Sequence, residues 1–175
     1  MTRILALAAA LLALPAAPAL AVFSGDMSPR AESGDKDYAA AIRARKAKDW
    51  PVMIENLDKV VARRPWHDNA HNLLGYGHRK LGRFEKALHH YHTALELNPR
   101  HREALEYLGE AYLQMGQPEK AKETLDRLAK VCAGVALTFS DGDFTDGCDE
   151  WRELKEAYDY YLDTGMAPED ETPPW

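Results

Sequence analysis

The sequence predicts an all-α fold made of three helix-turn-helix repeats, an α-solenoid, followed by one C-terminal capping helix. A pattern of small, apolar and proline residues returns every 34 residues without a gap, from about residue 34 to residue 132. Within each copy, apolar residues recur at the spacing of one helical face. The chain has 175 residues, which suits a short repeat array and excludes two large enzyme domains.

The copies are residues 34–67, 68–101 and 102–135. The middle copy carries the pattern most fully, with Leu74, Gly75, Ala87, Tyr91 and Pro99. The third copy keeps four of its positions, Leu108, Gly109, Tyr112 and Ala121, but has no closing proline. The first copy is the most divergent, with Ala41 in place of the glycine and Met53 in place of the alanine. The predicted helices are residues 35–47, 51–63, 68–81, 84–97, 102–115 and 118–131.

Each element has a local physical reason. Gly75 and Gly109 lie inside predicted helices, where glycine costs about 1 kcal/mol against alanine, so another helix must approach closely there. Ala87 and Ala121 are the small residues expected to meet them. The buried seam is predicted to consist of Leu74, Tyr91, Leu97, Leu108, Leu125 and Leu128. Pro51 and Pro118 suit the start of a helix, and Pro65 and Pro99 follow the end of one.

The period of 34 residues, with its early small pair, central turn and late proline, resembles the tetratricopeptide repeat. In that family the first helix of each pair lines a concave groove that binds a protein or peptide. The resemblance therefore implies a protein-binding groove lined by Tyr38, Ile42, Arg45, Lys46, Asn69, Asn72, Tyr76, Arg79, Lys80, Glu103, Glu106, Glu110 and Gln114. The cations of the first two repeats are expected to form a positive strip, and the glutamates of the third repeat to oppose an acidic ligand. A groove that is merely solvated is the alternative.

The N-terminus has the pattern of a secretory signal peptide over residues 1–21. Arg3 precedes an apolar run, and Ala19 and Ala21 supply the small residues of a cleavage site. Cleavage after Ala21 would leave 154 residues, which begin with a linker at 22–33 and have no membrane attachment. The alternative is that the segment stays uncleaved and anchors the protein in the membrane. We expect a periplasmic protein. Its net charge is −6, or −7 without residues 1–21, which argues against binding nucleic acid or anionic lipid.

After residue 135 the repeat pattern stops. We expect a loop at 136–148, a capping helix at 149–163 with Asp149 as its N-cap, and a disordered acidic tail at 164–175. The apolar stripe of the helix is Trp151, Leu154, Tyr158, Tyr161 and Leu162. In an oxidising compartment the two cysteines, Cys132 and Cys148, are expected to form a disulfide that ties the last repeat to this helix. A metal or redox pair is the alternative, although no Cys-x-x-Cys is present.

Two further patterns suggest metal binding. All seven histidines lie between positions 67 and 101: His67, His71, His78, His89, His90, His92 and His101. Their spacing predicts packing between helices more than a shared site, with His89, His90 and His92 on different faces. The acidic run at 141–146 is near a calcium loop, but Arg152 stands where such a loop ends in glutamate.

The sequence therefore predicts a scaffold that binds a protein or peptide. No nucleophile elbow, phosphate-binding loop or paired metal motif is present, so neither an enzyme nor a cofactor is expected. The alternative is a periplasmic metal-binding or metal-delivery protein that uses the histidines or the acidic loop.

Overall fold

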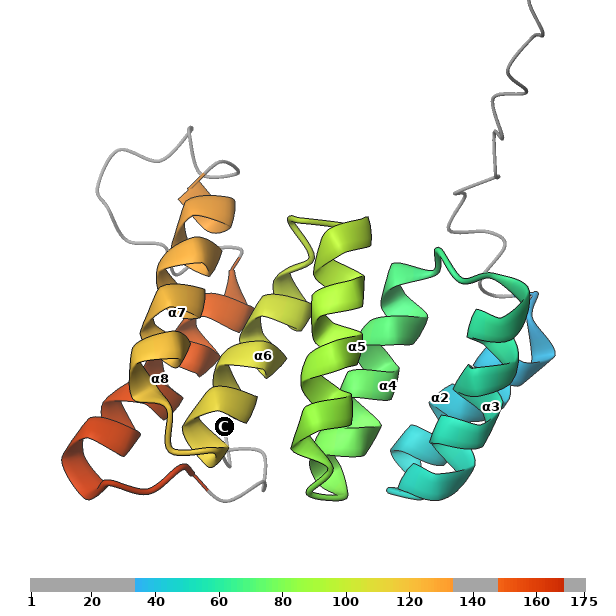
Figure 1. The fold of residues 1–175 in the computed structure, drawn as a ribbon, viewed down its shortest axis with the longest axis horizontal. Helices are drawn as coiled ribbons and strands as arrows, with labels where there is room; N and C mark the ends of the chain where they lie inside the picture. Colours follow the sequence, from blue (N-terminus) through green and yellow to red (C-terminus); the bar gives the residue numbers. More distant parts are fainter. Residues whose placement is uncertain (1–33, 134–147, 169–175) are drawn as a thin grey trace, which may run out of the picture.

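The computed structural model describes residues 34–133 and 148–168, which form seven helices and no strand. Each helix begins and ends within one turn of its predicted bounds. The helices are α2 (Lys36–Lys46), α3 (Trp50–Arg63), α4 (Asp68–Lys80), α5 (Phe84–Leu97), α6 (Arg102–Gln114), α7 (Pro118–Ala133) and α8 (Asp149–Thr164). In Figure 1 the helices form one row whose pairs follow the chain, from α2 and α3 at one end to α6, α7 and α8 at the other. No helix in the described part is long and apolar enough to cross a membrane.

The helices pack as successive antiparallel pairs. The pairs are α2 with α3, α4 with α5, and α6 with α7, and the second helix of each pair contacts the first helix of the next. Helix α8 packs against both α6 and α7, so it continues the stack where a fourth pair would begin. This is the position predicted for the capping helix, and it covers apolar surface that the third pair would otherwise expose.

The repeat is also visible in the backbone of the turns. Lys48, Gly82 and Gly116 have φ values of 56°, 68° and 68°, and they stand 34 residues apart at the turn inside each pair. Glycine adopts this left-handed conformation at no steric cost, whereas lysine does not. The first repeat therefore keeps the geometry of the turn although it has lost the glycine.

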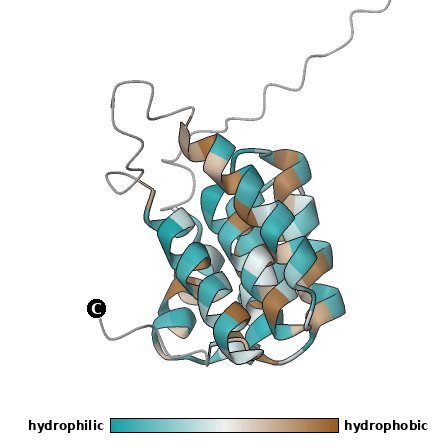
Figure 2. Cartoon of the chain, turned by 90° about the vertical axis from the view of Figure 1, so that its left-hand side faces the viewer, coloured by the Kyte–Doolittle hydropathy of each residue, from teal (hydrophilic) through white to brown (hydrophobic). Residues whose placement is uncertain are grey.

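Two clusters of buried apolar side chains form the core. The first joins α2, α3 and α4 around Met53, Leu57 and Leu74, and the second joins α5 to α8 around Tyr91 and Leu105. The helices are amphipathic, with hydrophobic and hydrophilic residues interleaved along each of them (Figure 2). Of the predicted seam, Leu97 is wrong: it is 40% exposed, because it lies in the last turn of α5.

The helical glycines mark close approaches, but to other partners than predicted. A Cβ on Gly75 would lie 2.6 Å from the ring of Tyr91, and a Cβ on Gly109 would lie 2.5 Å from Leu154. These larger side chains, rather than Ala87 and Ala121, are the nearest neighbours. Gly109 in α6 therefore leaves space for the side chain of Leu154 in α8.

The capping helix differs from the prediction in two details. Its N-cap is Cys148, and Asp149 is its first helical residue. Leu154 is fully buried and Trp151, Tyr158 and Tyr161 pack against the core, but Leu162 is 61% exposed because it lies off the contact face near the end of the helix. Thr164 closes α8, and Gly165 follows with a φ of 71° as a C-cap.

A disulfide joins Cys132, in the last turn of α7, to Cys148 at the start of α8. Their Cα atoms are 5.9 Å apart. The bond links the third repeat to the capping helix, as predicted. The predicted signal peptide at 1–21, the predicted linker at 22–33, the acidic run at 141–146 and most of the predicted tail lie outside the described residues.

Candidate binding groove

The first helices of the three repeats meet on one face of the array, which we call the first-helix face. A tyrosine–cation cluster, formed by Arg45, Tyr76, Arg79, Lys80 and Tyr107, spans α2, α4 and α6 on this face. The Arg45 guanidinium lies 4.9 Å from the centre of the Tyr76 ring, and Arg79 and Lys80 lie 5.5 and 5.1 Å from the same ring. The predicted positive strip is therefore organised around one aromatic ring.

Tyr107 completes the cluster and was not among the predicted groove residues. Its ring lies 5.1 Å from that of Tyr76, and its hydroxyl oxygen accepts a hydrogen bond of 3.0 Å from Arg45 Nη2. Burial raises the pKa of Tyr107 above its ordinary value, so the hydroxyl stays protonated. The sequence could have indicated that Tyr107 lines this face, because it lies four residues after Glu103 and three before Glu110, on the same side of the helix.

The charge on the first-helix face is partly neutralised by pairing between repeats. Arg79 is 4% exposed and forms an ion pair of 2.7 Å with Glu110. The fully buried Asn72 donates a hydrogen bond of 3.0 Å to Glu103. One cation of the expected positive strip, Arg79, is therefore paired with a glutamate of the third repeat. Adjacent first helices bring position 79 beside position 110, and a buried guanidinium requires a partner.

Glu106 is turned into the protein and does not belong to an open surface. It is buried between α6 and α8, where it hydrogen-bonds to Glu153. Burial, and then the neighbouring Glu110, Glu153 and Glu103, together raise the pKa of Glu106 to about 10. Its carboxyl group is therefore neutral near pH 7 and offers a hydrogen bond in place of a charge.

The other predicted groove residues differ in accessibility. Tyr38 stacks on His67 at 5.1 Å and, with Ile42, packs against the first core cluster. Asn69 accepts a hydrogen bond of 3.0 Å from His101 Nε2. Lys46 is exposed and Gln114 is half-buried. The part of the predicted set that is brought together and keeps contact with solvent is thus centred on Arg45, Tyr76 and Lys80.

The histidines have structural contacts instead of a common centre. His67 Nδ1 and His101 Nδ1, 34 residues apart, accept hydrogen bonds from the backbone N–H groups of Ala70 and Ala104 and so cap α4 and α6. His92 lies 3.3 Å from the Tyr112 hydroxyl. Over residues 34–133 and 148–168, no three His, Cys, Asp or Glu side chains are placed to hold a metal ion. The metal-binding alternative gains no support from them.

His71, His78 and His90 pack between α4 and α5, as predicted for His71 and His78. His71 Nε2 donates to the Pro65 carbonyl at 3.0 Å, so its Nδ1 accepts from His90 Nδ1 at 3.2 Å. Burial, and then the neighbouring histidines, lower the pKa of His90 to about 4. The contact between α4 and α5, which separates the two core clusters, therefore contains imidazole rings that are uncharged at neutral pH.

These features define the class: an α-solenoid of stacked helix pairs with an aromatic and cationic patch on its first-helix face. A family model of the tetratricopeptide repeat matches residues 78–131. This match confirms the resemblance for that segment.

Solved structures extend the likeness to most of the chain. The complex of the TPR2B domain of yeast Sti1 with pHsp70 has a TM-score of 0.57 at 18% identity, covering 69% of this chain and 94% of that one. The Sgt2 TPR domain from Aspergillus fumigatus gives 0.57 at 17%, covering 85% and 91%. PcrH in complex with the chaperone binding region of PopD gives 0.61 at 15%, covering 75% and 95%. At these identities the likeness shows the fold, which is that of tetratricopeptide repeats. No curated protein sequence matches the chain.

Proposed function

We propose that this protein is a periplasmic, non-enzymatic scaffold that binds a protein or peptide on its first-helix face. The observation that carries the proposal is the Tyr76 ring surrounded by three cations contributed by two repeats. Tyrosine and arginine are the side chains that most often dominate binding energy at protein interfaces. Two structures with the same fold hold a partner, pHsp70 in one and a region of PopD in the other.

The partner segment that this face suits is acidic. Arg79 is fixed by Glu110, but Arg45 and Lys80 keep contact with solvent around Tyr76, and Lys46, next to Arg45 in α2, is exposed. An acidic side chain placed there would meet cations already held in position, which lowers the ordering cost of binding. Glu103 and Glu110 on α6 would repel the same ligand and confine it to the first two repeats.

The proposed location follows from two features. Residues 1–21 have the composition of a secretory signal, and the paired Cys132 and Cys148 suit an oxidising compartment. Fusion of the first 30 or so residues to a reporter that is active only after export tests this part of the proposal. A reporter that stays in the cytoplasm would contradict it.

Affinity capture from a periplasmic extract, followed by mass spectrometry, tests the binding face. The variant Lys46→Ala/Lys80→Ala removes two cations from the first-helix face and spares the buried ion pair of Arg79. The matched control Lys59→Ala/Lys130→Ala removes two exposed lysines from α3 and α7. We expect the first variant to lose most of the captured partner at low salt, where charges are least screened, and the control to retain it. Equal capture by both variants at low ionic strength would exclude this face as the binding site.

A further inference from the structure

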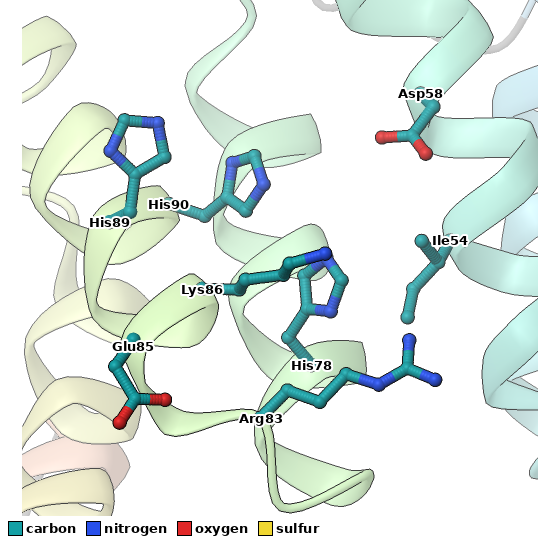
Figure 3. Close-up of a pocket in the computed structure, with 8 residues that line it drawn as sticks. All are labelled: Ile54, Asp58, His78, Arg83, Glu85, Lys86, His89 and His90. Atoms are coloured by element: carbon teal, nitrogen blue, oxygen red, sulfur yellow. The ribbon is translucent and has the colours of Figure 1, made fainter.

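A second hollow lies on the opposite side of α4 from the tyrosine–cation cluster. It is an open pocket of about 570 Å³ between α3, α4 and α5. Its walls are Ile54 and Asp58 from α3, His78 from α4, Arg83 and Lys86 from the start of α5, and His90 from the middle of α5, with Glu85 and His89 at the edge (Figure 3). Nothing in the proposed peptide binding uses these residues.

Polar side-chain atoms of the pocket have no hydrogen-bond partner among the described residues, and His78 in the tautomer protonated at Nδ1 has a donor to offer. His78 is 6% exposed, and among the described residues its Nδ1 has no hydrogen-bond partner. An unpartnered polar atom at such depth is uncommon, because burial without a hydrogen bond is costly. Arg83 and Lys86 are exposed, and within residues 34–133 and 148–168 neither forms an ion pair or a side-chain hydrogen bond.

These two cations lie close enough to act on His78. Burial is the main cause that lowers the pKa of His78, and the charges of Lys86 and Arg83 lower it further. Figure 3 shows the Lys86 side chain crossing above the His78 ring and Arg83 extending toward Ile54. The positive charges are thus gathered beside a buried imidazole nitrogen that has no partner.

The helix that begins at the pocket adds to this positive potential. Arg83 is the N-cap of α5, and its side chain makes no capping hydrogen bond. The N–H groups of the first turn of a helix carry partial positive charge, and without a side-chain cap they remain available. By contrast, α2, α3, α4 and α6 each have a side chain that accepts from the first turn.

We propose that this pocket binds an oxyanion, a phosphoryl or carboxylate group, with Arg83 and Lys86 as charged donors and His78 Nδ1–H as a buried donor. Charge-assisted hydrogen bonds of this kind are among the stronger ones in proteins. Asp58 stands on the α3 side and Glu85 at the edge, so the pocket accommodates one anionic group and disfavours an extended polyanion. The site is separate from the peptide-binding face and does not depend on it.

Titration of the ¹⁵N-labelled mature protein by NMR, with sodium sulfate and with sodium acetate in separate series, tests the proposal. Sulfate represents a phosphoryl group and acetate a carboxylate, and sodium chloride at matched ionic strength gives the non-specific baseline. We expect saturable shifts of the His78 ring nitrogens and of the first-turn amides of α5. Saturation with sulfate alone identifies a phosphoryl site, and saturation with acetate alone identifies a carboxylate site.

Variants decide whether the named side chains hold the ion. Lys86→Gln and Arg83→Gln each remove one exposed cation, and each should weaken binding about tenfold, equivalent to about 1.4 kcal/mol. Lys130→Gln removes an exposed cation from α7 and should leave the titration unchanged. The proposal is overturned if neither anion gives saturable shifts beyond those of chloride. It is equally overturned if Lys86→Gln and Arg83→Gln both bind as the wild type does. Capture of a peptide on the first-helix face is unaffected by either result.

Discussion

Replacing Gly109 by alanine tests how closely the capping helix is packed on the third repeat. The new Cβ would lie 2.5 and 2.6 Å from the Cδ2 and Cδ1 atoms of Leu154, well inside van der Waals contact. Leu154 is fully buried, so it cannot turn aside without displacing its neighbours in the core. Overpacking costs about 1 to 3 kcal/mol, and a contact of 2.5 Å with a fully buried side chain belongs to the upper part of that range, about 2 to 3 kcal/mol. Alanine regains about 1 kcal/mol of helix propensity, so we expect a net loss of about 1 to 2 kcal/mol.

Thermal and urea unfolding followed by circular dichroism measure this loss, which should lower the melting temperature by about 4 to 8 °C. Leu154→Ala removes the atoms that the new methyl group would contact. The two changes together should therefore cost at least about 1 kcal/mol less than the sum of the single changes. Gly34→Ala is the control, since a Cβ there meets nothing within 4 Å. If Gly109→Ala is as stable as the wild type, α8 does not approach α6 as closely as described.

Three further predictions concern the ion pair, the disulfide and the histidine layer. Arg79→Ala should lower the free energy of unfolding in urea by about 2 to 3 kcal/mol. This is less than the usual 3 to 5 kcal/mol for a broken buried pair, because Glu110 remains partly exposed to solvent. Lys80→Ala should change it by less than about 0.5 kcal/mol, and similar losses for the two variants would refute the role assigned to the Arg79–Glu110 pair. Thiol titration of the exported protein under denaturing conditions should find no free cysteine, and two titratable thiols would contradict the Cys132–Cys148 bond. Reduction of the bond should lower the free energy of unfolding by about 3 kcal/mol, while the protein retains most of its helical signal. Burial, and then the neighbouring histidines, lower the pKa of His90 to about 4 from 6.5, so the unfolded chain binds more protons at this residue and the stability that neutral His90 contributes falls as the pH drops through this window. The raised pKa of Glu106 acts in the opposite direction, so the test compares each variant with the wild type. At pH 5 the full effect of His90 is about 2 kcal/mol, and we expect about 1 because the half-buried ring is partly screened by solvent. Relative to the wild type, His90→Gln should therefore lose about 1 kcal/mol less stability between pH 7.5 and pH 5 in urea unfolding, whereas His89→Gln, on the exposed side, should behave nearly as the wild type does. An unchanged pH dependence in His90→Gln would contradict the assignment to His90.

The helices and their order were predictable because the repeat period imposes them. Each turn has a residue of positive φ at the same register, including Lys48, where the sequence no longer shows a glycine. The disulfide was predictable because only two cysteines exist, and the helix order brings them together. These are properties of local sequence and of register, which a single chain reveals directly.

The candidate site was less predictable because its contacts join different repeats. The register placed Arg79 on the first-helix face, but whether it is free or paired depends on the side chain that α6 brings alongside, which is Glu110. The same applies to Glu106, whose burial depends on α8. The exposed Leu97 and Leu162 have helical spacing that fits the seam, yet within residues 34–133 and 148–168 no other element covers their ends of the helices.

The pairing of Arg79 changes what the first-helix face can select. Four free cations would attract any acidic chain, mainly through long-range charge, and their binding would depend steeply on salt. With Arg79 neutralised, the accessible cations are held around Tyr76, where Arg45 is oriented by the hydroxyl of Tyr107. A ligand then gains most by presenting its acidic group close to the ring, where distance and orientation matter more than total charge. The face is therefore better suited to recognising one short acidic segment than to collecting acidic proteins in general.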